Sequence, residues 1–241
     1  MKTRILICIT ALILLNSCIV NSLFPFFTQD TISFEKAFLG IWEDKKNKSN
    51  RWIVASVEDV YQNAKDKAEE KDIVSYNKYK KGYYIFYEEK SEDRTTAFLA
   101  MPFKINNQLF LDFIPLFYDI NNTSLESHHL VPTHSLVKFD ILDNNTIDIK
   151  WFSSDKLEGL IKNNRIKISY EKIDVSGDKY LLTAPSNELQ KFIKKYMVSN
   201  DANKWKTDIK FNLKRTKSPE ESLDLIKKIM NDKADLSGKH F

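Results

Sequence analysis

The stretch that decides the fold is residues 135–152, SLVKFDILDNNTIDIKWF. Its two arms, 135–142 and 146–152, largely alternate apolar and polar side chains, as strands with one buried face do. The intervening Asp143-Asn144-Asn145 is a turn signal. Together they predict an antiparallel hairpin.

Similar signals recur on both sides of this hairpin. β-branched and aromatic runs predict further strands at 51–57, 82–87, 95–103, 108–114, 166–170, 179–183 and 208–214. Helical signals lie at 34–38, 155–162, from Asn187 to Met197 and from Ser218 onward, and 60–70 is a helix or a long loop. Many short strands favour a closed sheet, because closure removes exposed edges. The prediction is a mainly β, antiparallel β-barrel, with a helix before the last strand and a C-terminal helix.

The chain begins like an export signal. Lys2 and Arg4 precede an apolar run, 5–15, that is shorter than the roughly 20 residues needed to span a bilayer. We therefore expect residues 1–17 to be a cleaved signal peptide.

The end of this leader, Leu15-Asn16-Ser17-Cys18, resembles the lipobox of bacterial lipoproteins, with Asn16 a less usual residue at its position. The resemblance implies cleavage before Cys18 and acyl chains, palmitate among them, on that residue. Several chains on one residue anchor a protein stably. Because Ile19 follows in place of Asp, the resemblance implies the outer membrane, with the domain facing the periplasm. The alternative is a secreted protein whose signal happens to end near a cysteine.

Cysteine and charge restrict the remaining classes of function. The two cysteines, Cys8 and Cys18, leave the mature chain with no thiol for a disulfide, a metal site or a nucleophile. The 37 basic and 33 acidic residues become 35 and 33 once Lys2 and Arg4 are removed. We therefore expect no nucleic-acid partner, which would need a clustered positive excess.

Gly40-Ile41-Trp42, after the helical turn, resembles the G-x-W start of lipocalins. The resemblance implies a lipocalin-like barrel in which Gly40 and Trp42 are structural residues of the closed end. A basic residue usually pairs with that tryptophan, and Arg215 or Lys214 could serve here.

A wider resemblance covers most of the mature chain. The segments 38–42, 109–112, 129–134 and 181–189 resemble recurring blocks of an uncharacterised bacterial lipoprotein family. This resemblance implies architecture and location and does not imply a reaction.

Histidines suggest the strongest candidate for a metal site. His128, His129 and His134, with Asp112 and Asp119 upstream, offer possible ligands. Their spacing matches no zinc signature, so we expect hydrogen bonding at strand ends and neither a metal nor another cofactor.

Catalytic motifs are weak. The sequence contains no G-x-S-x-G, and the S-x-x-K matches at Ser75 and Ser135 lack their companion motifs. We expect a protein without catalytic residues that is not an enzyme; the alternative is a His-dependent metalloenzyme.

Two functions remain open for the barrel. Aromatic residues could line a cavity for a small apolar ligand, or they could fill the core, leaving a structural or protein-binding lipoprotein. The residues in question are Tyr83, Tyr84, Phe86, Tyr87, Phe98, Phe110, Phe113, Phe117 and Tyr118. The expected organisation is a signal peptide (1–17), a lipid-anchored tether (18–33), the barrel domain (34–216), and a C-terminal helix and tail (217–241).

Overall fold

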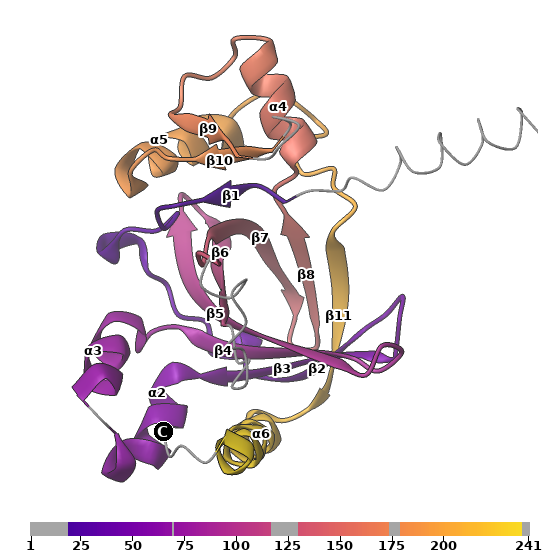
Figure 1. Ribbon diagram of the computed structural model, residues 1–241. Coiled ribbons are helices and arrows are strands. Elements are labelled where there is room, and N and C mark those ends of the chain that lie inside the picture. The colour runs from indigo at the N-terminus through magenta and orange to yellow at the C-terminus, as the bar shows by residue number, and fades with distance from the viewer. Residues whose placement is uncertain (1–18, 69, 117–129, 174–178, 238–241) are drawn as a thin grey trace, which may run out of the picture.

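The structure is a computed structural model. It describes residues 19–68, 70–116, 130–173 and 179–237 (Figure 1). Residues 1–18, which include Cys18, and residues 117–129, which include His128 and His129, lie outside the described ranges.

A closed, eight-stranded antiparallel barrel forms the centre of the molecule. Each strand pairs with the next along the chain, β6 pairs with β7, and β11 returns to pair with both β8 and β2. The prediction of a mainly β, lipocalin-like barrel is confirmed. The barrel strands are β2 (Gly40–Asp44), β3 (Asn50–Ser56), β4 (Tyr83–Glu89), β5 (Arg94–Ile105), β6 (Gln108–Leu116), β7 (His134–Asp143), β8 (Thr146–Trp151) and β11 (Lys210–Lys217).

Alternation along these strands divides their side chains between the barrel interior and its outer face. In β8, for example, Ile147, Ile149 and Trp151 point into the barrel, and the polar residues between them point out. Outward-facing apolar residues on other strands need separate cover. Helices cover these outward-facing residues on one side of the barrel, and a second layer of the structure covers them on another side.

The second layer, which we call the cap, consists of residues 153–173 and 179–209 together with the N-terminal residues 19–27. It contains β1 (Asn21–Ser22), α4 (Ser154–Lys162), β9 (Tyr170–Lys172), β10 (Tyr180–Leu182) and α5 (Ser186–Met197). Leu157, Leu189 and Ile193 are fully buried in the cluster that the cap forms with outer-face residues of the barrel, such as Phe110. The cap therefore covers one side of the barrel (Figure 1).

Helices cover the far side. The last helix, α6 (Pro219–Ser237), packs on the outside of β2 and β3, where Ile226 is fully buried. The segment between β3 and β4 forms α2 (Val57–Ala64), the 3-10 turn η3 (Lys65–Lys67) and α3 (Glu70–Tyr79). Within the described residues, none of the helices has both the length and the apolarity needed to cross a bilayer.

The N-terminal segment is the main departure from the expected elements. Residues 18–33 were expected to form an irregular tether whose aromatic residues either dock on the domain or lie at the lipid surface. Phe26 and Phe27 dock, since both are buried, but the strand β1, which lies between β7 and β10, was not expected. Another 3-10 turn, η1 (Gln29–Thr31), follows. The described chain is therefore part of the fold from Ile19 onward.

Two smaller predictions were wrong. The strand expected at 166–170 is absent up to Ser169, because Ile166 and Ile168 pack against the cap cluster and only β9 pairs in the sheet. The expected cap of α5, Ser186, is its first helical residue, and Pro185 occupies the capping position.

Candidate functional site

The barrel interior is crossed by aromatic rings. Trp52 on β3 lies 5.2 Å from Tyr87, 6.2 Å from Phe113, 6.1 Å from Trp151 and 5.0 Å from Phe211, measured between ring centroids. These rings come from five strands, so the contacts span the interior from one wall to the other. At such distances aromatic pairs attract each other in addition to burying apolar area.

The aromatic residues that might have lined a cavity divide between two faces. Tyr83, Tyr87, Phe98 and Phe113 face the interior, where they contact other side chains. Tyr84, Phe86 and Phe110 alternate with them and face outward. Phe117 and Tyr118 lie outside the described residues. The inward-facing rings act as core.

One end of the barrel is closed by the 3-10 turn η2 (Lys36–Phe38) and the start of β2. Phe38 is fully buried, with its ring 4.9 Å from Phe139 and 5.2 Å from Tyr83. The Tyr83 hydroxyl accepts from the Glu35 amide at 2.8 Å and donates to the Glu35 carbonyl at 3.0 Å. Burial raises the pKa of Tyr83.

Trp42 and Arg215 complete this closed end. The Trp42 indole N–H donates to the Phe38 carbonyl at 2.9 Å. Arg215 lies opposite Trp42 in the β11–β2 pairing, with its guanidinium carbon 4.2 Å from the indole centroid. It also donates to the carbonyls of Leu39 and, at 2.6 Å, Ala37. Of the two basic residues considered for this position, Arg215 holds it, and Lys214 is exposed opposite Glu43.

Gly40 makes that contact possible. Its φ of +126° is in the region that L side chains rarely adopt, and an added Cβ would lie 2.6 Å from an Arg215 nitrogen and 2.8 Å from the Lys217 carbonyl oxygen. The absence of a side chain at Gly40 therefore leaves room for Arg215 to stack on Trp42.

Asp112, which is fully buried, and His134, which is partly buried, form a hydrogen-bonded pair on the outer face of the barrel. The His134 Nδ1 lies 2.6 Å from the Asp112 Oδ2, and the Phe26 amide donates to the other carboxylate oxygen at 3.4 Å. Burial raises the pKa of Asp112, and the bonds from His134 and Phe26 act in the opposite direction. The pair therefore attaches the N-terminal segment to β6 and β7.

This pair is the part of the candidate metal cluster that the structure brings together. His128, His129 and Asp119 lie outside the described residues. Over 19–68, 70–116, 130–173 and 179–237, no three histidine, cysteine or acidic residues are grouped to hold a metal ion. In the same ranges, the side-chain hydrogen bond of His134 is the one to Asp112.

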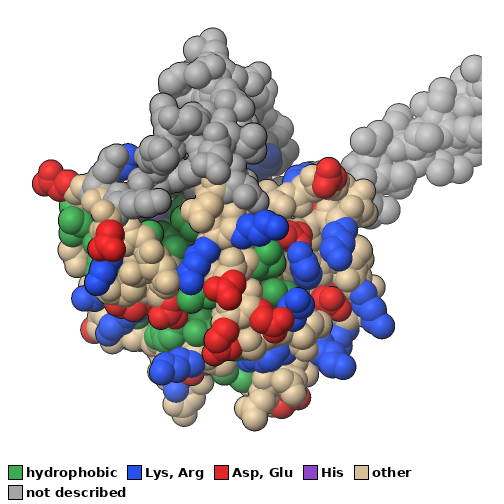
Figure 2. All heavy atoms as spheres, turned by 90° about the horizontal axis from the view of Figure 1, so that it is seen from below, with side chains coloured by type: hydrophobic (Ala, Val, Ile, Leu, Met, Phe, Trp, Pro, Cys, Tyr) green, Lys and Arg blue, Asp and Glu red, His purple; other side chains and the backbone are tan. Residues whose placement is uncertain are grey.

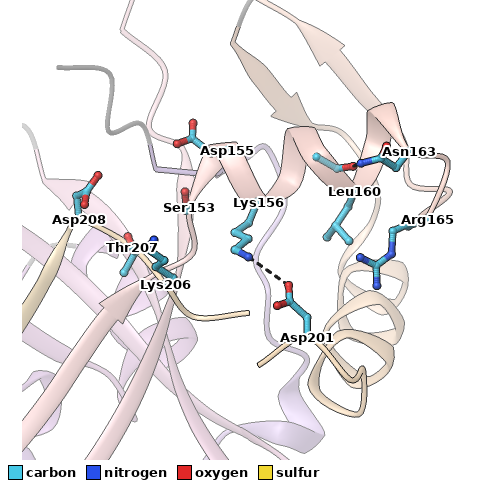
Figure 3. Close-up of a pocket in the computed structure, with 11 residues that line it drawn as sticks. Ser153, Asp155, Lys156, Leu160, Asn163, Arg165, Asp201, Lys206, Thr207 and Asp208 are labelled. Atoms are coloured by element: carbon cyan, nitrogen blue, oxygen red, sulfur yellow. Dashed lines mark hydrogen bonds and ion pairs between the residues drawn. The ribbon is translucent and has the colours of Figure 1, made fainter. Parts of the chain in front are cut away.

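The cap carries two adjoining hollows. The first, about 460 Å³, lies between α4 and residues 201–208 (Figure 3). The second, about 590 Å³, lies between residues 164–168 and α5. Leu160, Arg165 and Asp201 line both. Each volume is in the range of small-molecule sites.

The end of α4 sets the geometry of these hollows. Asn164 has a φ of +53°, and its amide and the next one donate back to the carbonyls of Ile161 and Leu160. This is a Schellman ending with asparagine in the left-handed position. It reverses the chain so that Arg165 extends toward α5 (Figure 3).

An ion pair crosses the first hollow. Lys156 on α4 donates to Asp201 at 3.2 Å, drawn as a dashed line in Figure 3. The Asn203 amide, at 2.8 Å, and this lysine lower the pKa of Asp201. The carboxylate is therefore already partnered.

These hollows were not predicted from the sequence. Its usable signal was Asn163-Asn164 directly after a predicted helix, since asparagine is a common left-handed helix ending. Neither the approach of α5 nor that of residues 201–208 is visible in the local sequence.

Comparisons of the chain with models of known protein families, with curated proteins and with solved structures gave no match.

Proposed function

We propose that this chain is a non-enzymatic lipoprotein of the bacterial envelope, in which lipid on Cys18 holds a solid barrel directly at a membrane surface. The observation that carries the proposal is the start of the fold. Ile19 forms a bridge with Ser153, and the Val20 amide donates to the Phe152 carbonyl at 3.1 Å. No linker separates the lipidated residue from the domain.

The location follows from the sequence around the anchor. The basic and apolar leader and the lipobox support export and lipidation, and Ile19 after Cys18 favours the outer membrane. The domain then faces the periplasm.

Two functions were considered for the barrel: binding an apolar ligand inside it, and a structural or protein-binding role with a filled interior. The packing of the interior supports the structural or protein-binding role. The ring contacts around Trp52 and Phe38 fill the space that a ligand would occupy. The protein then acts through its outer surface, as a structural or protein-binding lipoprotein. An apolar ligand inside the barrel is the alternative.

Lipidation is tested by expressing the full chain in a bacterium with labelled palmitate. The expected result is label on the wild-type protein, none on Cys18→Ser, and retention of the wild type in the membrane fraction. An unlabelled wild-type chain that is released as a soluble protein would show that the anchor is absent.

The alternative is tested by native mass spectrometry of the mature chain with Cys18→Ser. A bound apolar molecule in stoichiometric amount would support the ligand-filled barrel. It should be retained when exposed cap residues are substituted and lost when interior residues are substituted. A mass equal to that of the chain alone supports the solid barrel.

A further inference from the structure

The second hollow of the cap has a basic rim. Arg165 and Lys167 lie on one side, and Lys191 and Lys195, one turn apart on α5, lie on the other. Glu188 and Asp201 are the acidic residues of the lining, and Asp201 is bonded to Lys156. Positive charge therefore predominates around the opening.

These basic groups are available. All four side chains are exposed, and none forms a salt bridge or side-chain hydrogen bond with another described residue, although Arg165 interacts electrostatically with Asp201. Unpaired basic groups on both walls can donate to one anionic group held between them.

The floor of the hollow is apolar. It consists of Leu160, Ile166, Ile168, Phe192 and Tyr196, all buried or half-buried. Phe192 and Tyr196 lie one helical turn apart, with ring centroids separated by 5.7 Å. A ligand that fits both parts has an anionic head and an apolar chain.

The hollow lies close to the start of the fold. It adjoins the first hollow, whose lining includes Ser153, and Ser153 is the bridge partner of Ile19. A membrane that holds Cys18 would therefore lie near the cap.

From these contacts we infer that the second hollow binds an anionic phospholipid, with the phosphate between Arg165 and Lys191 and an acyl chain over Ile166, Ile168 and Phe192. That this site lies close to a membrane rests on the proposed function, in which Cys18 carries lipid. Bound lipid adds a second attachment and fixes which side of the cap faces the bilayer.

The test is calorimetric titration of the mature chain carrying Cys18→Ser. The probes are dihexanoyl phosphatidylglycerol, dihexanoyl phosphatidylcholine and inorganic phosphate, with both lipids below their micellar concentrations. Saturable binding of the anionic lipid, at least tenfold tighter than that of either other probe, is expected. Equal binding of the zwitterionic lipid would show that the net charge of the head group does not contribute. Equal binding of phosphate would show that the acyl chains do not contribute. Either result would overturn the proposal.

The variant that tests the residues is Arg165→Gln/Lys191→Gln/Lys195→Gln. A basic residue near an anionic lipid contributes roughly fivefold to affinity, so a loss of tenfold or more is expected. The matched control, Lys65→Gln/Lys90→Gln/Lys228→Gln, removes the same charge from exposed positions outside the cap. On the face opposite the cap, basic and acidic side chains are intermixed (Figure 2).

Binding that falls equally in both triple variants would overturn the site and indicate a general effect of net charge. Because the altered side chains are exposed, unchanged unfolding curves are expected for both. The titration needs no lipid on Cys18. Absence of lipid binding would therefore contradict the site in the cap alone, whereas absence of the palmitate label would contradict the proposed anchor.

Discussion

The Arg215 guanidinium lies 4.2 Å from the centre of the Trp42 indole ring and bonds the two carbonyls, of Ala37 and Leu39, that flank the end of the η2 turn. One side chain thus joins the last barrel strand, the first barrel strand and the segment that closes the barrel. The guanidinium thereby provides hydrogen-bond donors for carbonyls at the end of the turn.

Replacing this arginine should weaken the fold. Arg215→Ala removes charge-assisted hydrogen bonds and a cation–π contact, so we expect the free energy of unfolding to fall by roughly 2–4 kcal/mol. Lys214→Ala, at the exposed neighbour, should change it by less than about 0.5 kcal/mol. Urea unfolding measures both, and equal effects would show that the stacked contact contributes nothing specific.

Two glycines should respond in opposite directions to the same change. Gly40→Ala forces a side chain into a strained conformation and into contact with Arg215, and should cost roughly 2–4 kcal/mol. Gly159→Ala, in α4, places a Cβ where nothing lies within 4 Å, and should stabilise by about 0.5–1 kcal/mol. Thermal unfolding of both variants distinguishes the strained position from the helical one.

A filled barrel should resist enlargement of its core. Ala100 is fully buried among the inward-facing side chains, so Ala100→Leu should destabilise the protein by roughly 1–3 kcal/mol through overpacking. A hollow barrel would instead accept the larger side chain with unchanged or increased stability. Denaturant unfolding separates the two.

Asp112 should make stability depend on pH. Burial raises its folded-state pKa above that of the unfolded chain, so between these two values the folded state binds more protons. The contribution of Asp112 to the free energy of unfolding is then fully present below about pH 4, and it is lost as the pH rises through the folded-state pKa.

The variant Asp112→Asn should lack this fall, because its side chain does not titrate. Unfolding free energies measured at several pH values from about 4 upward should show wild type losing stability relative to the variant. The exposed Asp143→Asn serves as the control and should follow the wild-type curve. Parallel curves for wild type and Asp112→Asn would contradict the assignment.

Alternating segments were predictable because their pattern reports burial directly. The hairpin at 135–152 became β7 and β8, and the alternating segment after Asp208 became β11, which closes the barrel. Helices with one apolar face, such as α5, were predictable for the same reason.

Features that depend on distant pairing were not predictable. The short strand β1 has no pattern of its own and exists because β7 and β10 border it. The choice between Lys214 and Arg215 depends on which of them faces inward, and that follows from the pairing with β2. Likewise, the basic rim of the cap combines residues that are brought together by a helix ending and by α5.

The position of β1 also constrains how an exported chain could finish folding. Its residues pair in parallel with β10, 160 positions later in the chain. If the chain is translocated starting from its N-terminus, the earliest residues to cross must wait for some of the latest. Until β10 arrives, the edge of β1 that pairs with it has no partner, so a completed cap would require that translocation has passed β10 and α5, with only β11 and α6 still to follow.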